Sequence, residues 1–414
     1  MKIKNLRKEI RGVEVALVAD IENISFKTMP PHDNTIWVSV PDKYSECLAT
    51  DRYDGFLVAL LYPAMAYGED IEIDGAVSKR LLRNINVFVQ DILLAYNDKL
   101  QRIDIKARET TSQLISSAKH IGTGFSGGVD SFSTIYDNYV LENDPEYKID
   151  TLVCLNVGSH GEYGDAETFK MFENRCVFLK QYADAVGLPF IPVDSNIHVY
   201  HEWGHQLTHS LTLTSGILTL QGMFSKYYVA SVGWNYNQWI IEAAKQRNHD
   251  IGEFSEPYLL PLLSTESTEF VLDGMQYTRV QKTLNISNYP LTKKFLNVCV
   301  VNEPQVKNCG RCDKCARVGL TLSAVGKLDE YKDVFDISTY KKNEQRLMCR
   351  AVQTFKSNPF MADILDLAKK VGKKYPSRFY VFLRSTVAHL KRFKHRTQDK
   401  MKAIVRAFVR TCLP

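Results

Sequence analysis

The residues with the clearest chemical potential lie in one short segment, 126–131, with the sequence Ser-Gly-Gly-Val-Asp-Ser. Two adjacent glycines let a backbone turn tightly and approach a ligand without a Cβ in the way, and amides at the start of a helix favour an anion. Because Asp130 would repel a phosphate group, we expect it to hold Mg2+ that bridges phosphate oxygens. The segment therefore predicts a phosphate-binding loop, and its contacting residues are Ser126, Gly127, Gly128, Val129, Asp130 and Ser131.

A second group of residues suited to chemistry is a cluster of four of the nine cysteines, namely Cys299, Cys309, Cys312 and Cys315. Four thiolates within reach of one tetrahedron suit a structural Zn2+, and the pairs separated by two residues can bind one metal. Basic residues between and beside the cysteines offset the negative charge of such a site. An iron–sulfur cluster is the competing interpretation, and four unmetallated thiols are the third.

The elements that must position these residues follow from hydrophobic periodicity. Residues 118–300 alternate strand-like and helical stretches, which predicts βαβ units and a parallel sheet with ligands at the carboxyl ends of its strands. The expected strands are His120–Phe125, Thr151–Val157, Phe190–Val193 and Tyr227–Val232, and the expected helices are Ser131–Val140, Ala166–Ala185 and Leu207–Phe224.

The flanking regions differ from this pattern. Residues 1–115 combine strand-like stretches at Val13–Val18 and Ile36–Val40 with a helical pattern over Lys79–Tyr96, for which Ser78 is a candidate N-cap. Residues 335–414 are expected to be helical. The prediction is an α/β protein with three regions: an N-terminal α+β domain of unknown role (1–115), a doubly wound parallel ATP-binding domain with the cysteine knuckle at 299–315 (118–320), and a basic helical C-terminal region (335–414).

The SGGVDS segment after an apolar strand resembles the signature of the PP-loop ATP pyrophosphatase superfamily, whose members share an adenine nucleotide alpha hydrolase-like fold. The resemblance covers about residues 118–320. A PP-loop domain followed by four knuckle cysteines is similar to the 7-cyano-7-deazaguanine synthases of queuosine biosynthesis, whose cysteines hold zinc. Three features depart from those synthases, namely the spacing between Cys299 and Cys309, the short segment Gly158-Ser159-His160 and the large flanking regions. The flanking regions would fit a biosynthetic or phage-defence paralogue.

The resemblance implies a chemistry and a set of residue roles. Members bind ATP, release pyrophosphate and adenylylate an oxygen of the substrate, from which ammonia or another nucleophile displaces AMP. The implied substrate is a deazaguanine-type carboxylic acid, and the implied cofactors are ATP, Mg2+ and Zn2+. Asn156 and Gly158 would lie near the adenine and ribose, and the residues assigned to catalysis are Asp130, Ser126, Lys282 and Arg279.

Two other functions stay open on the sequence. A tRNA thiolation enzyme could use the same scaffold with the cysteines as an iron–sulfur or persulfide site, and the colour and metal content of the isolated protein would separate it from a zinc-containing ligase. A non-catalytic nucleotide-binding scaffold is the third possibility, although it would not require an acid among the phosphates.

The remaining features concern partners and location. The net charge is +5, from 52 basic and 47 acidic residues, and it does not by itself indicate nucleic acid. The last stretch is nonetheless strongly basic, which suits either a solvated helix face or an acceptor protein or nucleic acid. The absence of an apolar signal in MKIKNLRKEIRG and of any run of about 18 apolar residues predicts a cytoplasmic protein without a membrane partner, and oligomers are compatible with it.

One further motif, His201-Glu202-Trp203-Gly204-His205, fits the helical zinc site of metalloproteases. Its glycine and its position inside the βαβ series argue against that assignment. The alternative is that these histidines line the mouth of a ligand pocket or lie on the surface.

Overall fold

The structure is a computed structural model, and it describes residues 1–25, 34–160, 166–201, 203, 205–245, 254–300 and 306–383. The chain divides into two compact units. The first unit comprises Met1–Asn308 and Glu330–Phe335, and the second comprises Cys309–Asp329 and Asp336–Pro414.

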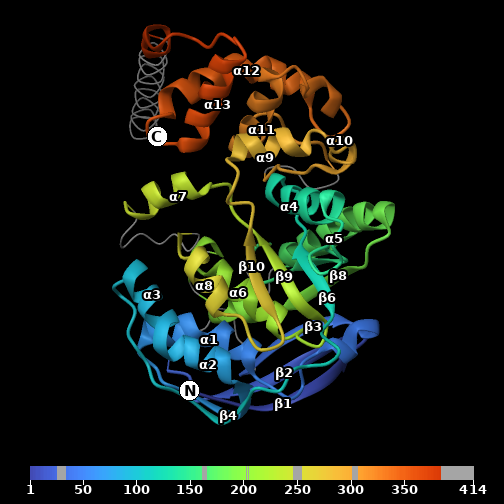
Figure 1. Cartoon of the computed structure of the whole chain (residues 1–414), viewed down its shortest axis with the longest axis vertical. Coiled ribbons are helices and arrows are strands. Elements are labelled where there is room, and N and C mark those ends of the chain that lie inside the picture. The colour runs from blue at the N-terminus through green and yellow to red at the C-terminus, as the bar shows by residue number, and fades with distance from the viewer. Residues whose placement is uncertain are drawn as a thin grey trace, which may run out of the picture. The chain divides into compact units, whose positions relative to one another are not determined.

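A ten-stranded sheet runs through the first unit, in the order β10-β9-β6-β7-β8-β3-β2-β1-β4-β5 (Figure 1). Five of these strands pair in parallel in the order β8-β7-β6-β9-β10. They are β6 (His120–Gly124), β7 (Thr151–Leu155), β8 (Phe190–Ser195), β9 (Phe224–Ala230) and β10 (Glu269–Asp273). The α/β architecture is therefore confirmed, and the four expected strands between residues 120 and 232 are present with shorter or shifted ends.

The N-terminal strands continue the same sheet. Val38 of β3 pairs with Ser195 of β8 in antiparallel register, so the strands of residues 1–115 and those of residues 118–273 form one surface. These strands are β1 (Lys2–Arg11), β2 (Glu14–Glu22), β3 (Thr35–Pro41), β4 (Ile71–Ser78) and β5 (Ile105–Thr111). The expected strands near residues 13–18 and 36–40 are confirmed by β2 and β3, whereas β1, β4, β5 and β10 were not predicted.

Helices of the first unit pack on this sheet because their apolar residues face it. The buried helix α1 (Asp54–Tyr67) and α6 (His205–Leu218) contribute to one large core together with strands from both parts of the sheet. The predicted N-cap at Ser78 is confirmed, since its side chain accepts a hydrogen bond from the amide of Leu81. The helix it begins runs on through α2 (Lys79–Asn84), a π-helical turn (Ile85–Val89) and α3 (Gln90–Tyr96).

The other helices of the first unit connect or follow the parallel strands. They are α4 (Val129–Ile135), which continues as a π-helical segment (Tyr136–Leu141), α5 (Ala166–Val186), α7 (Tyr236–Ala243), α8 (Glu256–Leu262), α9 (Arg279–Ile286) and α10 (Thr292–Phe295). Short 3-10 turns cover Asp42–Cys47 and Ile197–Tyr200.

The second unit is helical in its described part, as expected for the C-terminal region. Its helices are α11 (Asp313–Ala324), α12 (Ile337–Thr354) and α13 (Pro359–Lys370). Lys373, which follows α13, links α12 and α11 by donating to Glu344 at 2.8 Å and to Ser323 at 2.5 Å. Among the helices that the structure describes, none is both long and apolar enough to cross a bilayer.

Candidate functional site

The predicted phosphate-binding loop lies where the strand order of the parallel sheet reverses. From β6 the chain proceeds to β7 and β8 on one side, and then to β9 and β10 on the other. In open α/β sheets, ligands bind at the carboxyl ends of the strands at this switch point. Residues 126–131 follow β6 directly and lead into α4 (Figure 1).

The loop has the conformation that its residue types require. Gly127 has a φ of +72°, which glycine adopts without strain, and Gly128 is the N-cap of α4. Ser126 Oγ lies 3.2 Å from Ser131 Oγ and accepts from the Gly128 amide at 3.3 Å. Val129 is buried, so it offers a ligand only its backbone amide.

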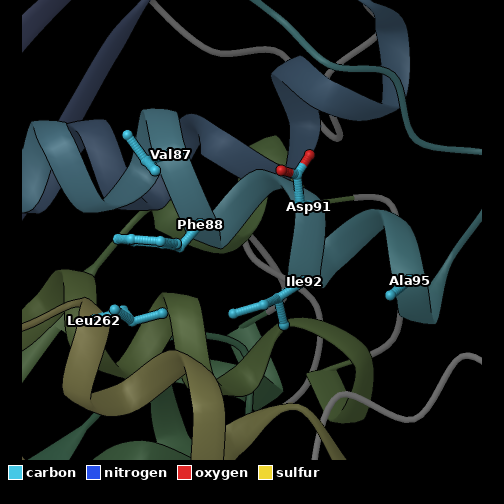
Figure 2. Close-up of a pocket in the computed structure, with 6 residues that line it drawn as sticks. All are labelled: Val87, Phe88, Asp91, Ile92, Ala95 and Leu262. Carbon is cyan, nitrogen blue, oxygen red and sulfur yellow. The ribbon is translucent and has the colours of Figure 1, made fainter.

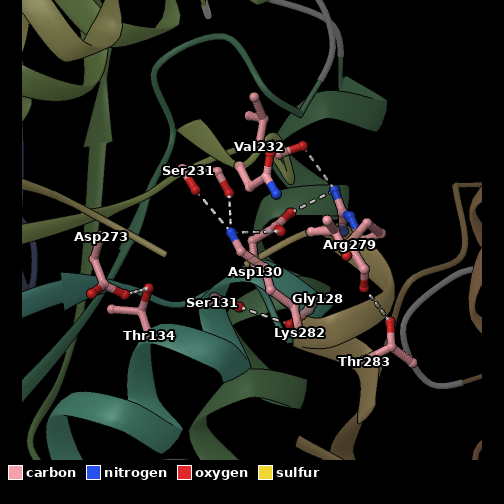
Figure 3. A network of polar contacts seen from close by, with 12 residues as sticks. Gly128, Asp130, Ser131, Thr134, Ser231, Val232, Asp273, Arg279, Lys282 and Thr283 are labelled. Carbon is pink, nitrogen blue, oxygen red and sulfur yellow. Dashed lines mark hydrogen bonds and ion pairs between the residues drawn. The ribbon is translucent and has the colours of Figure 1, made fainter. Parts of the chain in front are cut away.

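Two cations from α9 converge on the acid of the loop. Arg279 lies 2.8 Å from Asp130 Oδ2, and Lys282 lies 3.4 Å from Asp130 Oδ1. The same Lys282 Nζ donates to Ser231 O and Ser231 Oγ, both at 2.8 Å, and Arg279 donates to Val232 O at 3.1 Å. Figure 3 shows these side chains around Asp130, with residues from the loop, from the end of β9 and from α9 meeting at one point.

Lys282 is an unusual cation because its side chain is 0% exposed. Burial lowers the pKa of its ammonium below the ordinary value, while the Asp130 carboxylate opposes that shift. A desolvated ammonium interacts more strongly with nearby charge than the ammonium of a surface lysine does. The structure therefore brings together Ser126, Asp130, Ser131, Arg279 and Lys282, which the sequence analysis assigns to the loop or, by resemblance, to catalysis.

Two glycines make room for these cations. A Cβ at Gly233 would lie 2.6 Å from Arg279 Nε, and a Cβ at Gly274 would lie 2.7 Å from Lys282 Nζ. Both glycines have positive φ, +97° and +88°. Ser231 and Gly274 were not predicted as part of the site, and the available signal was the position of small residues directly after β9 and β10.

The loop is also braced from α5 and from the segment before the cysteines. The amide of Asn297 donates to Gly127 O at 2.8 Å, and its Oδ1 accepts from Arg175 at 3.0 Å. A Cβ at Gly127 would lie 3.1 Å from Leu179 Cδ2. Sequence analysis missed Arg175 and Asn297, since they are far from the loop in the chain.

Asn156 and Gly158 lie at the carboxyl end of the neighbouring strand β7. The Asn156 Nδ2 donates to Asp194 at 2.7 Å, while its buried Oδ1 has no hydrogen-bond partner among the described residues. Gly158 has a φ of +108° and approaches His198 and His205. Burial raises the pKa of Asp194 to about 6. These groups form a polar edge beside the loop, and within the described part of the chain no hydrogen bond joins Asn156 to residues 126–131.

The histidines of the metalloprotease-like motif point to different surroundings. His201 is buried and its Nε2 lies 2.8 Å from Ala59 O, whereas His205 approaches the turn at Gly158. Burial lowers the pKa of both imidazoles to about 4. They share no candidate metal group within the described residues, and Glu202 lies outside those residues.

The four cysteines do form such a group. The sulfur atoms of Cys299, Cys309, Cys312 and Cys315 all lie within 4.8 Å of one another, and those of Cys309 and Cys315 are 3.9 Å apart. Zinc–sulfur bonds of about 2.3 Å in a tetrahedron place the sulfurs about 3.8 Å apart, so the donor set fits a Zn2+ ion. The cluster can hold a metal ion.

A buried asparagine and a glycine shape the chain around these cysteines. Asn308 Oδ1 accepts from the amides of Val298 and Cys299, at 2.7 and 2.9 Å. A Cβ at Gly310, whose φ is +66°, would lie 2.9 Å from backbone atoms of residues 336 and 340. Glycine adopts this positive φ without strain, and Asn308 was not predicted to shape the cluster.

An apolar groove of about 410 Å³ lies away from these charged groups, between the helix that contains Phe88 and the end of α8. Figure 2 shows that Asp91 is the acid among its labelled residues, which are Val87, Phe88, Asp91, Ile92, Ala95 and Leu262. None of its lining residues is a cation, so we do not assign the chemistry of the loop to it.

Comparisons with known proteins give no relative for this chain. It matches no protein-family model, and no curated protein and no solved structure is significantly similar to it. The functional interpretation therefore depends on the geometry of the site and on the motif resemblance.

Proposed function

We propose that the chain is an ATP-dependent, AMP- and pyrophosphate-forming C–N ligase of the PP-loop type, with the adenine nucleotide alpha hydrolase-like fold. The observation that carries the proposal is the meeting of the SGGVDS loop with Arg279 and Lys282 at the switch point of the sheet. A glycine turn, a helix start and two cations are the components needed to hold a pyrophosphate group.

Each residue has a role in this proposal. The amides of Gly127, Gly128 and Val129, with the hydroxyls of Ser126 and Ser131, hold the β- and γ-phosphates. Arg279 and Lys282 stabilise the negative charge that develops on the departing pyrophosphate. Asp130 is the residue that would hold Mg2+, and the metal supplies charge stabilisation on the phosphate oxygens when it is bound.

The polar edge at Asn156 and Gly158 is the proposed place of the adenosine. The strand β7 is parallel to β6 and adjacent to it, so its carboxyl end lies beside the loop. The adenylylated substrate is a carboxylate, of the deazaguanine type by resemblance, and ammonia or another amine is the nucleophile. The cysteine cluster is proposed as a structural zinc site because three of its four residues are buried.

The test is pyrophosphate release and AMP formation from ATP, with candidate deazapurine carboxylic acids and ammonia, followed by mass spectrometry of the products. We expect Asp130→Ala and Ser126→Ala to abolish both while the circular dichroism spectrum shows an intact fold, although Asp130→Ala should also lower the melting temperature because the buried Lys282 loses a counter-charge. The matched control is Ser225→Ala, a strand serine whose hydroxyl donates to His120 O at 3.3 Å outside the loop. Undiminished AMP formation in both loop variants would contradict the proposal.

The alternative of a tRNA thiolation enzyme makes a different prediction for the purified protein. A colourless protein with one zinc per chain supports the ligase, whereas a brown, iron-containing protein supports thiolation. Stoichiometric ATP binding with no AMP under any substrate combination would instead support a non-catalytic nucleotide-binding scaffold.

A further inference from the structure

The two units of the chain differ strongly in net charge, although the net charge of the whole chain is small. The first unit contains 29 basic and 40 acidic residues and has a net charge of −11, whereas the second contains 23 basic and seven acidic residues and has a net charge of +16. Such asymmetry within one chain is typical of proteins with a polyanionic partner. The charge of +5 for the whole chain therefore gives no indication of what the second unit contacts.

Half of this surplus lies in the described part of the second unit. Residues 309–329 and 336–383 contain 14 basic and six acidic residues. Three of the six acids pair with cations of the same unit: Asp313 with Arg350, Asp329 with Lys341, and Glu344 with Lys373. The exposed cations are Arg311, Lys314, Lys341, Lys342, Arg346, Arg350, Lys356, Lys369, Lys370, Lys374 and Arg378.

Aromatic side chains accompany these cations on the surface. Phe379 is 72% exposed and Phe382 is 65% exposed, although a phenylalanine side chain ordinarily contributes to a core. Both follow Arg378 in the chain. Exposed aromatic faces beside basic groups are the arrangement on which successive bases of a single strand stack.

Two contacts join this aromatic segment to the exposed side of α12. Gln345 Nε2 donates to Tyr380 Oη at 3.3 Å, and the Arg378 guanidinium lies 4.6 Å from the ring centroid of Phe355 at the end of α12. Lys342 and Arg346, four residues apart on α12, flank Gln345 and share one face of the helix. Cations and stacking surfaces therefore belong to one patch, which we define as Lys342, Arg346, Arg378, Phe379 and Tyr380.

We propose that this patch binds single-stranded nucleic acid. The cations would contact phosphates without reading sequence, and Phe379 would stack on a base. An acidic protein would satisfy the cations as well, but the repeated alternation of phosphate and base in a single strand matches cations and exposed rings side by side, and this match is why we choose a nucleic acid. Residues 384–414 add nine basic residues and one acid by sequence and lie outside the described residues.

The experiment measures the anisotropy of a fluorescein-labelled, 20-nucleotide single-stranded RNA with the full-length protein, without ATP, between 50 and 200 mM KCl. A single strand gives a slope of log K against log salt of about −0.7 per phosphate contact. We expect Lys342→Ala/Arg346→Ala to flatten that slope by about 1.4 and to weaken binding about tenfold. The control Lys99→Ala/Lys170→Ala removes the same charge from exposed positions of the first unit and is expected to leave both values unchanged.

A second variant separates stacking from charge. Phe379→Ala should weaken binding by about 5- to 100-fold with the salt slope unchanged, since a base–aromatic contact is lost and no phosphate contact is. Equal competition by polyglutamate and by RNA, together with no effect of Phe379→Ala, would overturn the proposal in favour of an acidic protein partner. Duplex DNA bound as tightly as the single strand would also overturn it.

The outcome is independent of the proposed ligase activity. The binding assay contains no nucleotide, and Asp130→Ala is expected to bind the RNA as the parent protein does. If the protein forms AMP but does not bind RNA, only the proposed nucleic-acid patch is refuted. If it binds RNA but forms no AMP, only the proposed ligase activity is refuted.

Discussion

Gly274 gives the sharpest test of how the cations are held. Its φ is +88°, and a Cβ added at this position would lie only 2.7 Å from Lys282 Nζ, so Gly274→Ala combines two costs. The left-handed backbone costs an alanine about 1–2 kcal/mol. Crowding in a packed interior adds about 1–3 kcal/mol, because Lys282 is 0% exposed and its ammonium is already bonded to Ser231 and Asp130.

The control separates the two costs. Gly187 also has a positive φ, +72°, but nothing lies within 4 Å of its Cβ position, so Gly187→Ala carries the backbone cost alone. Urea unfolding should show a loss of about 1–2 kcal/mol for Gly187→Ala and about 2–5 kcal/mol for Gly274→Ala. Titration calorimetry with ATP and Mg2+ should show unchanged affinity for Gly187→Ala and an affinity lower by about 10- to 150-fold for Gly274→Ala. This range corresponds to the loss of one charge-assisted hydrogen bond of about 1.5–3 kcal/mol. Equal stability losses in the two variants would refute the argument that Lys282 is fixed by the space at Gly274, and equal nucleotide affinities would refute its role in binding.

Two further predictions concern the metal site and acid stability. Cys315→Ser, at a 0% exposed position, should lose the bound metal and lower the melting temperature, because a structural metal stabilises the folded state. Elemental analysis and thermal unfolding measure the two effects. Retention of one metal per chain would exclude Cys315 as a ligand. His201 has a pKa of about 4 in the folded protein, below the value of about 6.5 in the unfolded chain. Its contribution to the free energy of unfolding is therefore fully present above about pH 6.5, and it falls by about 2 kcal/mol by pH 5. Urea unfolding of His201→Gln should show a smaller decrease between pH 7 and pH 5, and an identical decrease would assign the acid sensitivity to other groups.

The candidate site was easier to recognise in the sequence than the pairing of the sheet. The loop 126–131 is local, since its glycines, hydroxyls and acid specify a turn and a helix start without distant help. The four cysteines are nearly as local, because all lie within 17 residues of the chain. Residues from such segments can be assigned a chemistry from type and spacing alone.

The pairing of β3 with β8 could not be predicted in this way. The contact pairs Val38 with Ser195, and the sequence around either residue does not indicate the other as its partner. The strand β10 is only five residues long and lacks clear alternation, whereas β4 alternates over residues 71–74 before Gly75 and was missed nonetheless. Pairing between strands that are far apart in the chain depends on the packing of the whole unit. Hydrophobic periodicity is a local property of the sequence and does not predict that packing.

The two cations of α9 show what residue spacing can predict and what it cannot. Arg279 and Lys282 are three residues apart, so a helix places them on one face, and that much follows from sequence. Which anion they meet depends on α4 and α9 packing together at the switch point, 152 residues apart in the chain for Lys282 and Asp130. Asp130 meets both cations, and the carboxylate of Asp273 also acts electrostatically on Lys282. In the proposed nucleotide complex a pyrophosphate group would take up the two cations and an Mg2+ ion would take up Asp130, so the observed ion pairs and that complex use the same three side chains with exchanged partners.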